Sequence, residues 1–231
     1  MNHGSHPTKT LARALWLVFG ATALTVAIAA DPPAHIRGTI VSATPDSLTV
    51  QTSEGSMSVA LDSATRIAGI VPSSLSQIKA GTFVGIANVP GAGTSSALEV
   101  VVFPDAMKGA GLGDYPWDLP PAAMHGGAKT SAMTNGTVKS STTAGRMAAT
   151  SAMTNGTVKS ASNAHGLVLT VDYGKGEKTI EVPSGVPVVT IVQADRNKLL
   201  PGAHVVVTTK KDAPKSAASV AVGIDGTVPP M

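Results

Sequence analysis

Two carboxylates beside two aromatic residues form the pattern in this sequence that comes closest to a chemical site. Asp114 and Asp118 flank the stretch that holds Tyr115 and Trp117. A pair of acids next to aromatic rings is typical of sugar-cleaving sites and of cation-binding sites. Because nothing in the sequence sets the separation of the two carboxylates, we predict these four residues as a ligand-binding or partner-binding surface and not as a catalytic pair.

The two aromatic residues also have a structural interpretation. A large amphipathic ring usually buries its body and keeps its polar tip in water. Tyr115 and Trp117 are then expected to dock on the strands that precede them and to hold down the segment that leaves the domain. Replacing Trp117 by alanine separates the two interpretations, because docking predicts lost stability and a binding surface predicts lost binding.

Motifs of catalysis are missing from the sequence. The patterns G-x-S-x-G, H-E-x-x-H, G-x-x-x-x-G-K-[ST] and C-x-x-C do not occur. The glycines between residues 109 and 113 lack the strand, turn and helix that a dinucleotide loop requires. The sequence therefore predicts a protein that is not an enzyme and that has no cofactor.

Residues that bind metals are scattered along the chain. Beyond the N-terminal segment the histidines are His35, His125, His165 and His204, and no two of them have the i, i+2 or i, i+4 spacing of a metal pair. Cysteine is absent, which excludes disulfides and thiolate zinc sites. Methionines near residues 120–153 could serve as soft ligands for Cu(I), but a low-complexity composition explains them more simply. No metal site is predicted.

The N-terminus has the features of an export signal. Lys9 and Arg13 precede an apolar run that ends in the small-x-small pattern closing at Ala29. Residues 1–29 are predicted to be a signal peptide cleaved after Ala29, so the protein is expected in the periplasm or outside the cell. The alternative is an uncleaved anchor, because the apolar run is about long enough to cross a membrane at ~1.5 Å per residue.

Composition favours short strands over long helices. The chain is 43% hydrophobic but only 3% aromatic, and it contains 24 glycines and 16 prolines. Its net charge of +3 is too small for a surface that binds polyanions. Single-stranded nucleic acid is excluded as a partner, since the strands have almost no aromatic residues beyond Phe83 and Phe103 on which bases could stack.

The chain contains an internal duplication. Polar and apolar residues alternate, as in half-buried strands, at 38–42, 47–52 and 56–61 and again at 156–160, 167–171 and 178–182. Residues 61–84 align without a gap on 182–205, so that Gly81 meets Gly202 after a segment resembling a helical turn, where a left-handed glycine is expected. We predict two small β-barrel domains, residues 34–119 and 153–228.

Residues 120–152 are expected to be a flexible linker, because they are mostly Ala, Gly, Ser, Thr and Met. The eleven residues 130–140 recur identically at 150–160. Only the second copy leads directly into the strand at Leu167, so we predict that it opens the second domain and that the first copy is surplus linker. Such a linker spans about 30 Å as a random coil.

Several sequence segments resemble segments of a known protein family. They are EVVVFPDAMKG at 99–109, GDYPWDL at 113–119, MTNGTV at 153–158 and DGTVPPM at 225–231. Together they are similar to exported proteobacterial proteins of the domain of unknown function 5666 family, whose members have a signal peptide and OB-like β-barrels. The resemblance implies an all-β fold with two tandem OB-like barrels. Family sequences often have histidine where this chain has Val101 and Asp114.

Members of that family are often named metal ABC transporter permeases. A permease needs several spanning helices, and this sequence has one apolar segment of the required length. We therefore predict a non-catalytic periplasmic binding or interaction module for a protein, an envelope component or a small ligand, in contact with the membrane only if the signal segment is kept. The alternative is an accessory protein in metal handling, with weak binding by His, Met and Asp.

Overall fold

The computed structural model describes Met1 and residues 35–119, 130–144 and 166–229. Contacts divide the chain into residues 1–30 and 31–231, and all described elements belong to the second unit. The predicted signal peptide lies outside the described residues, apart from Met1. Within the described ranges, no helix has the length and apolar character needed to span a membrane.

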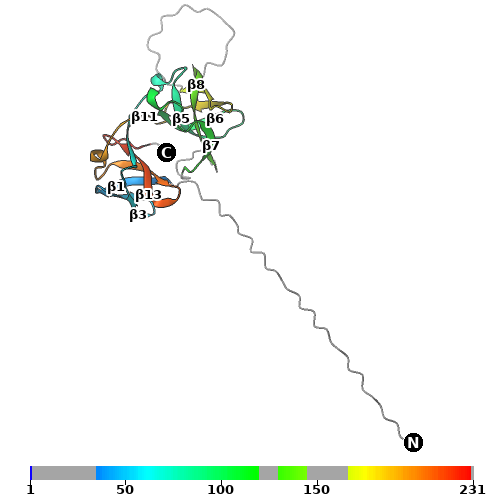
Figure 1. Ribbon diagram of the computed structural model, residues 1–231. Coiled ribbons are helices and arrows are strands. Elements are labelled where there is room, and N and C mark those ends of the chain that lie inside the picture. Colours follow the sequence, from blue (N-terminus) through cyan, green and yellow to red (C-terminus); the bar gives the residue numbers. More distant parts are fainter. Residues whose placement is uncertain (2–34, 120–129, 145–165, 230–231) are drawn as a thin grey trace, which may run out of the picture. The chain divides into compact units, whose positions relative to one another are not determined.

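Strands dominate the second unit, which confirms the predicted all-β class (Figure 1). The strands are β1 (His35–Ala43), β2 (Ser47–Thr52), β3 (Gly55–Ala60), β4 (Arg66–Pro72), β5 (Phe83–Val89), β6 (Ser95–Val102), β7 (Gly113–Trp117), β8 (Ser131–Thr143), β9 (Leu167–Asp172), β10 (Glu177–Val182), β11 (Val188–Gln193), β12 (His204–Lys210) and β13 (Ala213–Gly223). The short 3-10 helices are η1 (Leu75–Gln77), η2 (Asp105–Met107) and η5 (Arg196–Lys198).

Alternation of side chains explains why these segments are strands. In β2, Leu48 and Val50 are fully buried while the residues between and beside them are more exposed. The turn between β9 and β10 forms where it was predicted: Tyr173 N–H donates to the carbonyl of Gly176, and Gly174 has a positive φ of 87°. Local sequence is therefore sufficient to place strands such as β2, β3, β9 and β10 and the hairpin that joins the last two.

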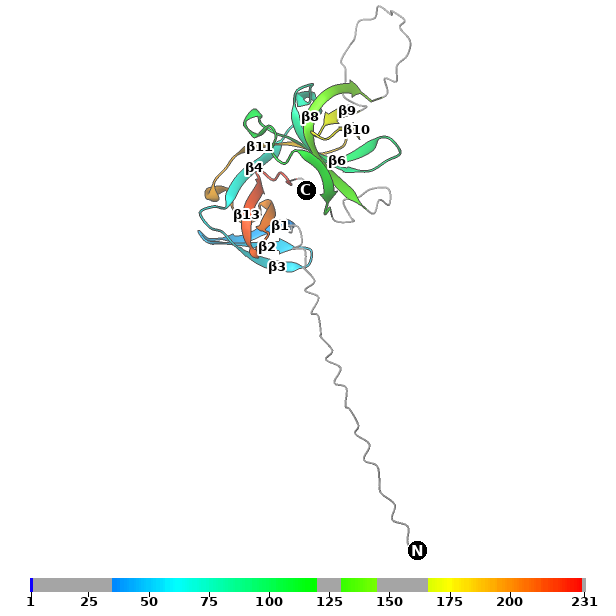
Figure 2. The same cartoon turned by 45° about the vertical axis from the view of Figure 1, so that its right-hand side comes forward.

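The strands close into five-stranded rings. Ring 1 has the order β13-β12-β1-β2-β3 and closes where Ser216 of β13 pairs with Ala60 of β3. Ring 2 has the order β6-β5-β8-β9-β10 and closes where Ile180 of β10 pairs with Ser95 of β6. Strands β4 and β11 pair with each other and join β13 to β6, and β7 pairs with β8. Figure 2 shows β1, β2 and β3 beside β13.

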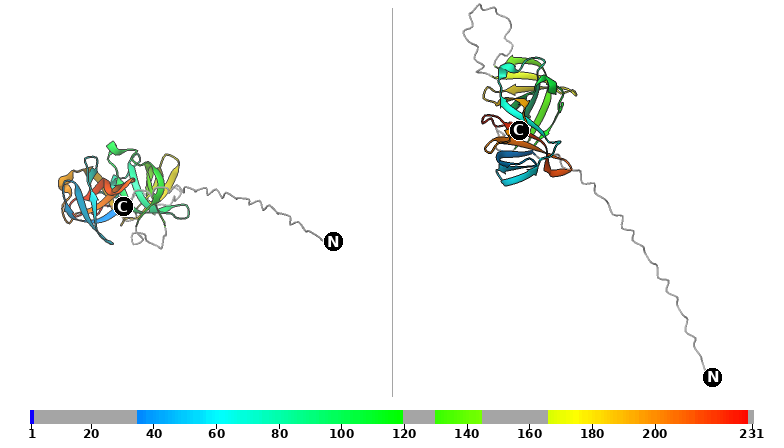
Figure 3. Two further views of the ribbon diagram at one scale, coloured as in Figure 1. Left: turned by 60° about the horizontal axis from the view of Figure 1, so that its bottom comes forward. Right: turned by 60° about the vertical axis from the view of Figure 1, so that its left-hand side comes forward.

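Each ring combines strands from both halves of the chain. Ring 1 takes β1 to β3 from the first half of the sequence and β12 and β13 from the second, as the blue and the orange-red ribbons show (Figure 3). Leu48 and Val207 share its core, and Ile86 and Leu169 share the core of ring 2. Residues 34–119 and 153–228, which were expected to form separate barrels, therefore contribute to both cores.

The prediction that residues 130–140 are surplus linker is wrong. They belong to β8, which pairs with β5, β7 and β9. Met133 and Val138 are almost completely buried. Gly136 faces the backbone of β9, and a Cβ there would lie 2.3 Å from the carbonyl oxygen of Asp172, so at this position close strand packing requires glycine. The second copy, 150–160, lies outside the described residues.

The predicted duplication is visible in the order of elements. Strand β4, the turn η1 and strands β5 and β6 are repeated as β11, η5, β12 and β13. Gly81 and Gly202 have φ values of 88° and 87°, which confirms the left-handed conformation expected of both. The N–H groups of both glycines are hydrogen-bonded to a strand of the other repeat. Gly81 donates to the carbonyl of Val138 in β8, and Gly202 donates to the carbonyl of Ile40 in β1.

Candidate functional site

The predicted residues Asp114 to Asp118 lie on and just beyond β7, an edge strand. Tyr115 and Trp117 are on the same side of this strand, with ring centroids 6.2 Å apart. Both pack against a small core cluster that contains Met133. Burial raises the pKa of the Tyr115 hydroxyl. The rings are therefore partly buried against the sheet, as the docking interpretation expects.

Asp114 is occupied by partners from the same chain. Its carboxylate accepts a hydrogen bond from the Lys178 ammonium at 2.9 Å and one from the Thr134 hydroxyl at 2.7 Å. These contacts connect β7 to β10 and to β8. The carboxylate is thus engaged in holding strands together.

Asp118 belongs to a different group of residues. It accepts hydrogen bonds from the Arg37 guanidinium at 2.9 Å and from the His35 ring at 3.0 Å, and the His35 ring lies 4.4 Å from that of Trp117. Burial raises the pKa of Asp118, but the Arg37 hydrogen bond and the nearby charges of His35 and Arg37 lower it by more, so it lies below its ordinary value. The two predicted acids thus have separate cationic partners: Asp118 pairs with a residue of β1, and Asp114 pairs with a residue of β10. They do not form an acid pair.

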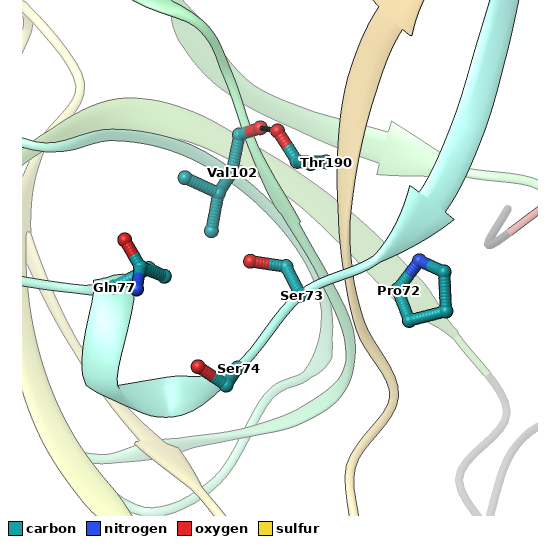
Figure 4. Close-up of a pocket in the computed structure, with 6 residues that line it drawn as sticks. All are labelled: Pro72, Ser73, Ser74, Gln77, Val102 and Thr190. Carbon is teal, nitrogen blue, oxygen red and sulfur yellow. Dashed lines mark hydrogen bonds between the residues drawn. The ribbon is translucent and has the colours of Figure 1, made fainter.

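A polar pocket of about 480 Å³ lies at the end of β4 and beside η1, next to the paired strands β6 and β11 (Figure 4). It is lined by Pro72, Ser73, Ser74, Gln77, Val102 and Thr190. The Thr190 hydroxyl donates to the carbonyl of Val102 at 2.8 Å, and the hydroxyls of Ser74 and Ser76 are 2.7 Å apart. None of these lining residues is ionisable, so the pocket offers hydroxyl and amide groups but no charge or base.

An apolar cleft of about 600 Å³ lies on the strands that join the two rings. Its floor comes from β4, β6, β11 and β13, and one wall comes from the segment after η2. It is lined by Arg66, Ala68, Ile70, Val101, Met107, Ala110, Gly111, Ile191, Ser219, Val220 and Ala221. Its volume is in the range of small-molecule sites, and most of its lining is aliphatic.

The wall of the apolar cleft is held by specific hydrogen bonds. Asn135 of β8 donates to the carbonyl of Gly111 at 3.1 Å and to the Tyr115 hydroxyl at 2.9 Å. The Ala110 N–H donates to the carbonyl of Met107 at 3.0 Å, which closes a turn after η2. Gly111 has a φ of 61°, and a Cβ there would lie 2.8 Å from the Asn135 amide nitrogen. The cleft is therefore preformed by the fold.

Sequence reasoning missed the residues of the apolar cleft. Ile70 of β4, Ile191 of β11 and Ser219 of β13 lie on neighbouring strands only because β4 pairs with β11 and β13, which no local pattern reveals. Asn135 was assigned to the linker. The one available signal was the gapless alignment of 61–84 with 182–205, which includes Ile70 and Ile191.

Metal ligands do not gather in the part of the chain that the structure describes, where no group of three or more His, Asp or Glu side chains comes together. Of the histidines noted above, His35 contacts Asp118, and His204 lies 3.4 Å from the Thr39 hydroxyl. His125 and His165 lie outside the described residues.

Comparison with known proteins gave no relatives for this chain. No family model matched the sequence, and neither the curated proteins nor the solved structures contained a match.

Proposed function

We propose that this protein is a non-catalytic binding module that acts after export, in the periplasm or outside the cell. The observation that carries the proposal is the apolar cleft: a preformed hollow of about 600 Å³, lined by aliphatic side chains and bounded by a wall that Asn135 holds in place. A site with these properties is suited to retaining a small molecule.

The chemistry of the lining supports binding over catalysis. The lining residues in the described part of the chain include no histidine, aspartate or glutamate that could serve as a general acid or base. Ser219 carries the only hydroxyl among the described lining residues, and none of those residues is a base that could activate it. The polar pocket likewise has hydroxyls without a base. The residues of both hollows can therefore hold a ligand, but they lack the groups that transfer protons.

A further part of the proposal concerns ancestry. Rings 1 and 2 are inferred to be OB-like barrels of a duplicated ancestor that have exchanged their last two strands, β12 and β13 for β5 and β6. The support is the pairing pattern: apart from the pairing of β7 with β8, every strand pairing between the first and second repeat has a counterpart with the repeats interchanged.

Native mass spectrometry of the untagged protein, purified from the periplasm of its producing cell, tests the proposed function. We expect a bound small molecule that solvent extraction releases. Ala68→Phe fills the floor of the cleft and should abolish its retention, whereas Lys211→Met, on an exposed turn outside the lining, should retain it. Recovery of a ligand-free protein, together with no binding from an extract of the same cells, would contradict the proposal.

A further inference from the structure

We propose that the apolar cleft binds a small amphiphile with one anionic group, and that the Arg66 guanidinium is the partner of that group. This inference rests on the proposed binding function and narrows it to a ligand class. The cleft combines one charged residue with a mainly aliphatic lining, and the chemistry of its ligand follows from that combination.

Among the residues that the structure describes, Arg66 is the only charged one that lines the cleft. It is exposed, and no ion pair or side-chain hydrogen bond engages it among the described residues. The other arginines near the sheet are occupied, because Arg37 binds Asp118 and Arg196 donates to the backbone carbonyls of Pro45 and Asp62. Arg66 therefore has donors available for a carboxylate or phosphate, which guanidinium groups bind with two parallel hydrogen bonds.

Away from Arg66, the cleft is lined by apolar side chains. Ile70 and Val101 are 4% and 1% exposed, and Ile191 lies beside them in the same small core cluster. Met107 of η2 also lines the cleft, and its flexible thioether can adapt to an apolar surface. In the described ranges, no charged side chain lines this region to pair with a second polar end, so the ligand must be apolar at the end that enters it.

The direction of the ligand follows from the duplication. Ser219 is the strand partner of Arg66, so one hydroxyl lies at the same end of the cleft as the guanidinium. The residue that aligns with Arg66 in the second repeat is Pro187, which has no charge. The anionic group is therefore bound at the β4–β13 side, and the apolar tail extends toward β11 and β6.

Calorimetric titration of the untagged protein with dodecanoate, dodecyl phosphate and dodecanol, each below its micelle concentration, tests the inference. Both anions should bind about tenfold more tightly than dodecanol, the gain expected of one charged hydrogen-bonded contact. Arg66→Met should remove that tenfold advantage and leave the affinity for dodecanol within about twofold. Lys211→Met also removes one positive charge, but outside the cleft. It should change neither the tenfold advantage of the anions nor the affinity for dodecanol. The ratio of the two anion affinities shows whether the site prefers a carboxylate or a phosphate.

Two variants locate the binding, and both should weaken it for all three probes. Ala68→Phe and Ala221→Phe each fill the floor from a different strand, so one serves if the other lowers the melting temperature strongly. Binding that neither variant weakens would place the site elsewhere and overturn the inference. Equal affinities for dodecanol and the anions, unchanged in Arg66→Met, would overturn the anionic preference but leave the proposed function standing. If no probe binds, the inference fails, and the proposed function fails with it only if no ligand co-purifies.

Discussion

Ile70 of β4 lies directly opposite Ile191 of β11, and the two residues occupy the same position in the two repeats. An antiparallel pair in which equivalent residues face each other has an approximate two-fold axis between them. The strand pairs on either side fit the same axis. Strand β4 is paired parallel with β13, and its equivalent β11 is paired parallel with β6, the equivalent of β13. The two repeats are thus joined as an exchanged dimer would be, within one chain.

The exchange predicts that neither half of the chain folds alone. A break between Leu119 and Thr130 leaves one fragment with β1 to β7 and the other with β8 to β13. Each fragment lacks two strands of one ring and three of the other, so its apolar core residues stay exposed. The fragments should be unfolded separately by circular dichroism and should regain the native spectrum on mixing. Two separately folded fragments would show that each half forms its own barrel.

The features predicted correctly from the sequence depend on residues close together in the chain, and the features that were missed depend on residues far apart. Strands such as β2 and β10 follow from alternation, and the left-handed Gly81 and Gly202 follow from a glycine after a helical turn. The exchange of strands could not be read in this way, because pairing β4 with β11 joins residues more than a hundred positions apart. The apolar cleft depends on that same pairing, so it was missed together with it.

Strand β8 shows a second limit of sequence reasoning. Residues 130–140 and 150–160 are identical, so no property of the segment itself distinguishes strand from linker. The choice of the second copy followed from its distance to Leu167 along the chain. In the structure the first copy occupies the position between β5 and β9, and its Asn135 also holds the wall of the cleft.

The repeated segments supply a matched pair of substitutions. Met133 is 1% exposed and packs against Ala87 and Leu119. Met133→Ala should lower the free energy of unfolding by about 2–4 kcal/mol, the range for a buried side chain that leaves a cavity. Met153→Ala makes the same change within identical sequence neighbours, and because the first copy occupies the β8 position, it should lower the free energy of unfolding by less than Met133→Ala does. Urea denaturation measures both. The reverse ranking would mean that the second copy occupies the β8 position.

Asp118 should make stability depend on pH in the acid range. Its pKa is lower in the folded state than the value near 4 expected in the unfolded chain. The ionised carboxylate therefore stabilises the fold above that value, and the contribution is lost as the pH falls through the folded pKa. Asp118→Asn should lower the melting temperature at neutral pH, and the difference from the parent should shrink below about pH 4. In an Arg37→Met background the effect of Asp118→Asn should be smaller at neutral pH, because the main cation that lowers this pKa is gone. An undiminished effect there would assign the stabilisation to another partner.

Trp117 separates the two interpretations of the β7 segment. Its ring is partly buried, lies 4.4 Å from the His35 ring and packs on the cluster around Met133. Trp117→Ala should therefore lower the free energy of unfolding by about 2 kcal/mol, less than for a fully buried tryptophan, while a ligand in the apolar cleft stays bound. Leu112→Ala is the control, because that side chain is 50% exposed and its loss should cost about 0.5 kcal/mol at most. Unchanged stability of Trp117→Ala combined with loss of the co-purifying ligand would instead place the binding surface on β7, since the ring would then contribute to recognition and not to the packing that joins β7 to the sheet.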